Sequence, residues 1–111
     1  MSSVKCNQQI VVLTGEDRTH YIDFTDDLSS GETLSSPVAT DYESTGDLTI
    51  SSVAVNTATF ENIDRETVAI GKGVQFKVSG ASVGRIYTIK ILADTTESET
   101  VGSLIDYTKA G

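Results

Sequence analysis

Alternating hydrophobic and polar residues mark the most regular stretch of the chain, residues 86–92. Tyr87, Ile89 and Ile91 fall on one face at a period of two, and Thr88 and Lys90 fall on the other. Alternation of this kind, in a run rich in β-branched residues, predicts a β-strand with one buried face.

A glycine stands shortly before this predicted strand. Gly84 lies three residues before Tyr87, so it provides a tight turn into a strand that starts with a tyrosine. In immunoglobulin-like sandwiches, a tyrosine near the start of a central strand sends its hydroxyl back to the upstream backbone, an arrangement called the tyrosine corner. The spacing therefore indicates structural roles for Gly84 and Tyr87.

Further short extended segments follow one another at spacings of roughly ten residues, with turn residues between them. Residues 74–78 alternate most cleanly among them, and the apolar runs 48–50 and 53–55 predict one strand with a break between them. Pro37, the only proline, cannot donate to a strand ladder and is expected at a sheet edge or a bulge. The pattern predicts an all-β fold of about seven to eight strands, a sandwich in preference to a small barrel.

The length of 111 residues allows one domain and is too short for two. We expect a loosely held N-terminal arm with a first short strand over residues 1–18, and the sandwich over residues 19–111. The apolar run of the arm could add a strand to the sheet edge of a neighbouring molecule, or could pair within its own sandwich. The residues of this run are the predicted partner-binding residues: Ile10, Val11, Val12 and Leu13.

The net charge of the chain bears on which kinds of binding partner can be expected. Lysine and arginine total 8 against 16 aspartates and glutamates, a formal net charge of −8. Binding of nucleic acid or of anionic membranes requires clustered cations, so neither is expected. The apolar runs are too short to span a bilayer, and the first residues lack the pattern of a signal peptide. We therefore expect a soluble protein that is made in the cytoplasm.

Candidate chemistry is sparse. His20 is the only histidine and Cys6 the only cysteine, so no paired nucleophile and base or four-cysteine zinc site is available. Carboxylates gather at residues 23–27 and 94–99 and could offer oxygens to Ca²⁺, but the spacing of a calcium-binding loop is absent. The sequence predicts no catalytic residue, no metal site and no cofactor, and thus a binding or structural protein rather than an enzyme.

Two motifs carry a resemblance to a known class of proteins. Tyr21-Ile22-Asp23-Phe24 runs into Gly31-Glu32-Thr33-Leu34-Ser35-Ser36, and Gly84-x-x-Tyr87-x-Ile89 is followed by a polar loop and a final strand. In these respects residues 19–105 resemble the small immunoglobulin-like structural proteins of tailed bacteriophages. The long N-terminal segment and the residues around 63–67 depart from that pattern.

The resemblance implies a non-enzymatic virion protein that is assembled in the host cytoplasm. It favours a capsid decoration, or cement, protein that binds and stabilises the lattice of the major capsid protein and that self-associates, for example as a trimer. A tail or fibre-to-tail adaptor protein of the same virion is the first alternative. A carbohydrate-binding adhesion module is a further alternative from a different functional class.

Overall fold

The structure is a computed structural model that describes residues 6–62 and 64–111. These residues form short β-strands, one 3₁₀ turn and no α-helix. In chain order the elements are β1 (Cys6–Val12), β2 (His20–Asp23), η1 (Thr25–Asp27), β3 (Leu34–Asp41), β4 (Thr49–Val55), β5 (Phe60–Glu61), β6 (Thr67–Val68), β7 (Gly73–Ser79), β8 (Ile86–Thr95) and β9 (Thr100–Lys109). The all-β class predicted from the sequence is confirmed.

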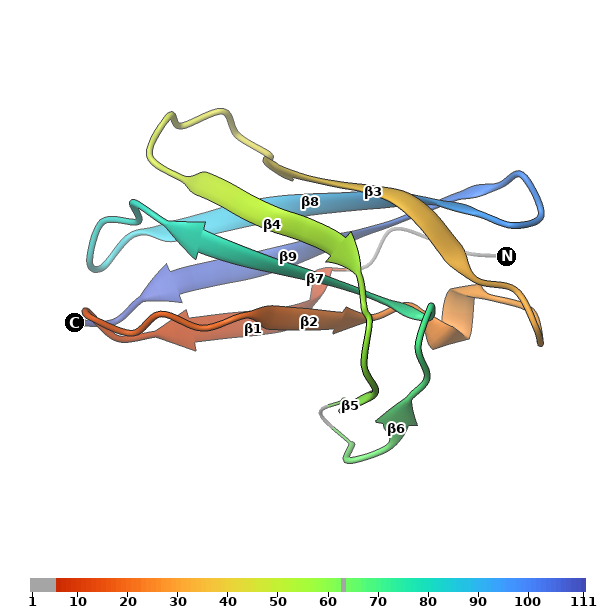
Figure 1. Cartoon of the computed structure of the whole chain (residues 1–111). Helices are drawn as coiled ribbons and strands as arrows, with labels where there is room; N and C mark the ends of the chain where they lie inside the picture. Colours follow the sequence, from red (N-terminus) through yellow and green to blue (C-terminus); the bar gives the residue numbers. More distant parts are fainter. Residues whose placement is uncertain (1–5, 63) are drawn as a thin grey trace.

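Two sheets pack face to face as a β-sandwich, as Figure 1 shows. The first has the strand order β1-β9-β8-β3, and the second has the order β2-β7-β4. Neighbouring strands are antiparallel except for β1, which runs parallel to β9. The short hairpin β5–β6 stands apart from both sheets and projects from the side of the sandwich (Figure 1).

The core is formed by the alternate residues of the central strands. Tyr87, Ile89 and Ile91 of β8 are fully buried, and they meet Val74 and Phe76 of β7 from the other sheet. Burying each such side chain contributes roughly 1.5–3 kcal/mol relative to leaving it exposed. The strict period of two in the sequence is thus the direct cause of the two-layer arrangement.

The hydroxyl of Tyr87 links three segments at one end of the sandwich. It accepts the N–H of Ser82 at 2.8 Å and donates to a carboxylate oxygen of Asp47 at 2.8 Å. Arg85 also donates to that oxygen at 3.0 Å, and its guanidinium lies 5.3 Å from the centre of the Tyr87 ring. Gly80 passes so close that an added Cβ would lie 2.2 Å from the carbonyl oxygen of Asp47, and its φ of +89° also requires glycine.

The edge strands β3 and β4 are both interrupted by bulges. In β3 the register shifts between Ser35 and Val38, where Pro37 removes a donor. In β4 the register shifts between Ser51 and Ala54, where Ser52 adopts a left-handed backbone conformation with φ of +55°. Bulges and proline prevent an edge strand from pairing with another molecule, so this side of the sandwich is protected against edge-to-edge association.

The apolar run of the expected N-terminal arm lies in its own sandwich. Ile10 pairs with Tyr107 of β9, and Ile10 and Val12 are buried in the core. Val11 and Leu13 point outward and are exposed. Of the two alternatives left open by the sequence, the structure shows pairing within the chain. Residues 1–5 of the expected arm lie outside the described residues.

A buried asparagine joins the second sheet to the chain around the hairpin. The side-chain amide of Asn56 donates to the carbonyl oxygens of Ala58 at 2.9 Å and Ala69 at 3.0 Å. Its side-chain oxygen accepts the N–H groups of Gly71 at 3.0 Å and Gly73 at 2.9 Å. With 1% of its surface exposed, Asn56 satisfies all of its side-chain hydrogen-bonding groups with backbone partners.

The Asn56 network gives a stability prediction. Replacing Asn56 by Ala leaves two carbonyls and two N–H groups without their partner, so the free energy of unfolding should fall by about 3 kcal/mol. Urea denaturation of Asn56→Ala measures this loss. Thr57→Ala, which changes the exposed next residue, is the control and should lie within about 0.5 kcal/mol of the wild type. A similar small effect for both variants would contradict the structural role.

Candidate functional site

A hollow of about 610 Å³ lies between β2, the η1 turn and the β5–β6 hairpin. Residues of β1 (Gln9) and of β9 (Gly102 and Ser103) also line it. Polar side chains predominate among the residues that line it: Gln9, Asp23, Thr25, Asp26, Asp27, Glu61, Asn62, Asp64, Glu66, Thr67 and Ser103. Three hydrophobic residues, Ile22, Phe24 and Phe60, also contribute, as do Tyr21 and Gly102.

Asp23, at the end of β2, is held by the turn that follows it. One of its carboxylate oxygens accepts the N–H of Thr25 at 2.8 Å and the hydroxyl of the same residue at 2.5 Å. The side-chain amide of Asn62 donates to the other oxygen at 3.1 Å. An aspartate side chain that accepts the backbone N–H of the residue two positions later forms an Asx turn, which is a common way for a turn to begin.

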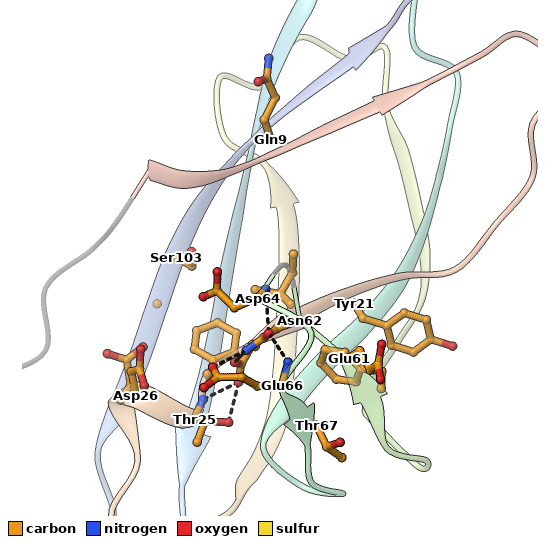
Figure 2. Close-up of a pocket in the computed structure, with 16 residues that line it drawn as sticks. Gln9, Tyr21, Thr25, Asp26, Glu61, Asn62, Asp64, Glu66, Thr67 and Ser103 are labelled. Carbon is orange, nitrogen blue, oxygen red and sulfur yellow. Dashed lines mark hydrogen bonds between the residues drawn. The ribbon is translucent and has the colours of Figure 1, made fainter.

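Asn62 organises the turn of the hairpin. Its side-chain oxygen accepts the N–H groups of Asp64 at 2.9 Å and Glu66 at 3.0 Å, and its amide also donates to the carboxylate of Glu66 at 3.3 Å. Figure 2 shows Asn62 within this hydrogen-bonded group, with Tyr21 and Glu61 to one side and Asp26 to the other. Through Asn62 the hairpin is tied to β2, which fixes the opening of the hollow.

An aromatic pair borders the hollow. The rings of Tyr21 and Phe60 are stacked with their centres 5.0 Å apart and their planes at 30°. Phe60 also packs against β7, because a Cβ on Gly73 would lie 2.7 Å from its ring. Tyr21 keeps 40% of its surface exposed. The pair is therefore anchored on one side and accessible to a ligand on the other.

The lining of the hollow is strongly acidic. Six of the lining residues carry carboxylates, and none is a lysine or arginine. Such a surface accepts hydrogen bonds from hydroxyl groups or from cationic donors. No three carboxylates, histidines or cysteines converge closely enough to hold a metal ion anywhere in residues 6–62 and 64–111.

A second, smaller hollow of about 540 Å³ lies beside the loop between β8 and β9. Asp27 and Glu99, one from each acidic group noted in the sequence, both line it. Close by, Glu32 is 3% exposed and accepts the N–H of Ser29 at 2.8 Å. The pKa of the Glu32 carboxyl is lowered from its usual value. The largest cause is the neighbouring hydroxyl of Thr95, and the N–H of Ser29 is the next.

The residues singled out in the sequence do not form one site. Gly84 lies in the turn before β8 and Tyr87 near the start of that strand, Pro37 lies in the β3 bulge, and the predicted partner-binding residues 10–13 lie in or just after β1. Asp23 is the member of the acidic group that the structure brings together with Asn62. Sequence reasoning did not identify Asn62 or the Tyr21–Phe60 pair, because a hydrogen-bonding asparagine and two rings distant in sequence leave no periodic signal.

Comparisons with known proteins add no relationship. No protein-family model, curated protein or solved structure matches the chain. Among the described residues there is no helix of the length and hydrophobicity needed to cross a membrane.

His20 lies inside the sandwich rather than in a site. Its ring is 5.7 Å from the rings of both Phe76 and Tyr107, and 7% of the residue is exposed. Burial, and then the positive charge of Arg18, lower the pKa of His20 from its usual 6.5, while Glu16 opposes this effect. The folded protein therefore keeps this ring neutral under conditions in which the unfolded chain binds a proton.

This shift predicts a pH dependence. A lowered histidine pKa in the folded state means that its contribution to stability is fully present above pH 6.5 and is lost as the pH falls from 6.5 through the folded pKa. Urea unfolding at about pH 8 and about pH 5.5 should show a larger loss for the wild type than for His20→Leu, which cannot titrate. Equal losses in the two proteins would show that His20 is protonated equally in both states.

Proposed function

We propose that this chain is an immunoglobulin-like, non-enzymatic structural protein of a tailed-bacteriophage virion, and that it decorates and stabilises the capsid. The proposal begins from the resemblance of residues 19–105 to such proteins. Its partner would be the major capsid protein, with a tail or fibre-to-tail adaptor role in the same particle as the alternative.

The topology of the two sheets supports the immunoglobulin-like assignment, and it is the observation that carries the proposal. If the hairpin β5–β6 is taken as an insertion, seven strands remain: β1, β2, β3, β4, β7, β8 and β9. In chain order they correspond to strands A, B, C, D, E, F and G of an immunoglobulin domain. The sheets then contain C-F-G and B-E-D in the neighbour order of an immunoglobulin constant-type sandwich. One difference is that β1, in the place of strand A, pairs with β9, in the place of strand G, instead of with β2, in the place of strand B. Tyr87, with its hydroxyl bound to the N–H of Ser82, occupies the place of the tyrosine corner.

The protected edges of the sandwich suit a protein that is displayed in many neighbouring copies. A shell concentrates its decoration proteins, and an open sheet edge would then promote uncontrolled pairing between them. The bulges of β3 and β4, with Pro37 in the first, remove that hazard on one side. Contacts with a shell would accordingly use sheet faces and loops.

A carbohydrate-binding role is the second candidate, and one observation favours it. The accessible ring of Tyr21 lies beside the carboxylate and amide groups of the hollow, and sugars bind proteins through ring stacking together with hydrogen bonds from their hydroxyls. Binding on a glycan array that is lost in Tyr21→Ala and kept in Tyr42→Ala would support this role. An array without binding would remove it.

The capsid role predicts an effect on particle stability. Particles produced from the encoding genome with this reading frame deleted should release their DNA at a lower temperature or after a milder change of salt than wild-type particles. Adding the purified protein should restore the wild-type midpoint, because decoration links neighbouring capsid subunits. The readout is fluorescence of a DNA-binding dye during heating.

An unrelated acidic protein of similar size, added in the same amount, is the control for nonspecific protection. Deleted and wild-type particles with the same melting midpoint would contradict the cementing role.

A further inference from the structure

β2 forms an open edge of the three-stranded sheet. Within residues 6–62 and 64–111 it pairs with β7 alone, so its other side has no strand neighbour. Phe24 donates its N–H toward β7, to the carbonyl oxygen of Lys72 at 2.9 Å. Since backbone groups alternate in direction along a strand, the N–H and C=O groups of Tyr21 and Asp23 point away from β7. These groups are available to a further strand.

The devices that protect the opposite edge of this sheet are missing from β2. β4 is bulged, whereas β2 keeps its register with β7 without a shift. β2 also contains no proline, lysine or arginine, the residues that proteins place on exposed edges to prevent pairing. Its length of 4 residues is too short for pairing between whole sheets. It can pair with a short peptide, provided that other contacts add to the binding.

The hollow provides room for such contacts because it follows this edge. Residues from both faces of β2 line it: Tyr21 and Asp23 from one face and Ile22 from the other. A space that is bordered by both faces of a strand lies beside its backbone edge rather than over either face. The volume of about 610 Å³ is within the range of about 300–1,000 Å³ that is typical of ligand sites.

The charge around the hollow selects the chemistry of the added segment. Among its six carboxylate residues, four are exposed: Asp26, Glu61, Asp64 and Glu66. No lysine or arginine is among the lining residues. An acidic segment would be repelled here, and a neutral one would gain nothing from the carboxylates. Lysine or arginine side chains would form charge-assisted hydrogen bonds with them.

The ring of Tyr21 offers a second contact that suits a basic side chain. It stacks on Phe60, which packs against β7 at Gly73, and 40% of Tyr21 stays exposed. A guanidinium or ammonium group within about 6 Å of such a ring is attracted to its face. Glu61 directly follows Phe60 in β5, and Figure 2 shows Tyr21 and Glu61 on the same side of the hollow. The ring and a carboxylate can therefore bind the same cation.

We propose that a short, extended, basic peptide segment of a partner protein binds as an added strand on the outer edge of β2, along the hollow. The backbone of the segment pairs with Tyr21 and Asp23, and its lysine or arginine side chains contact the ring of Tyr21 and the exposed carboxylates. This binding does not depend on the role in a virion. A free polyamine would meet the same carboxylates but could not pair with the strand edge, so backbone pairing distinguishes the two.

Titration of the full, isotopically labelled chain with synthetic peptides, followed by NMR, tests the proposal. The probes are peptides of about eight residues that alternate lysine or arginine with valine, threonine or tyrosine. Salt at about 0.15 M screens distant charges. The best of these peptides should bind with a dissociation constant of about 100 µM or below. Matched peptides with glutamate in place of the basic residues should not bind.

Strand addition has a signature that attraction between charges lacks. In the complex, hydrogen exchange of the Tyr21 and Asp23 N–H groups should slow at least tenfold, whereas that of Ile22, which already faces β7, should change far less. N-methylation of one set of alternate residues in the peptide should abolish binding, and methylation of the other set should not, because only one set faces β2.

A matched pair of variants locates the binding. Glu61→Lys reverses an exposed charge at the hollow and should weaken the binding of the basic peptides about tenfold. Glu43→Lys makes the same change at an exposed residue that does not line the hollow, and it should alter the constant less than twofold. Thermal melting establishes that both variants are folded.

Three outcomes would overturn the proposal. The first is that no basic peptide binds at concentrations up to about 1 mM. The second is that both variants weaken binding equally, because the attraction would then come from the net charge of the chain. The third is binding without slower exchange at Tyr21 and Asp23, because the peptide would then contact the carboxylates without pairing with β2.

Discussion

The hydroxyl of Tyr87 is the polar interaction on which the geometry of the sandwich depends. Its side chain is fully buried, so the hydroxyl has to find partners within the protein, and it does so with Ser82 and Asp47. Ser82 precedes β8 of one sheet, and Asp47 precedes β4 of the other. One side chain thus fixes how the two sheets meet at this end, and Gly80 leaves the space that this close approach requires.

The fold separates apolar, acidic and protected regions of the surface. Six carboxylates line the hollow beside the β5–β6 hairpin, whereas Val11, Val38 and Ile86 expose apolar side chains on the four-stranded sheet. The bulged strands β3 and β4 close one side to edge pairing. The hollow also has lining residues on β1 and β9, so it borders the four-stranded sheet as well as the hairpin.

The sequence predicted the parts of this structure that follow from local patterns. Alternation over residues 86–92 and 74–78 placed two central strands, and Pro37 and the break after residue 50 marked the two bulges. The pairing of β1 with β9 joins segments almost a hundred residues apart, so local periodicity could not select it over pairing with a neighbour. Asn56 and Asn62 escaped prediction for a related reason: their roles depend on backbone groups that only the tertiary structure brings near them. The two-residue strands β5 and β6 are too short to produce a pattern.

The measurement that tests the proposed function most directly is the copy number of this chain in purified particles, by quantitative mass spectrometry against the major capsid protein. Decoration of the shell predicts a ratio near one, or a simple fraction of it set by the symmetry of the lattice. A handful of copies per particle would contradict the capsid role and move the protein to the tail. Its absence from particles would contradict any role in the virion.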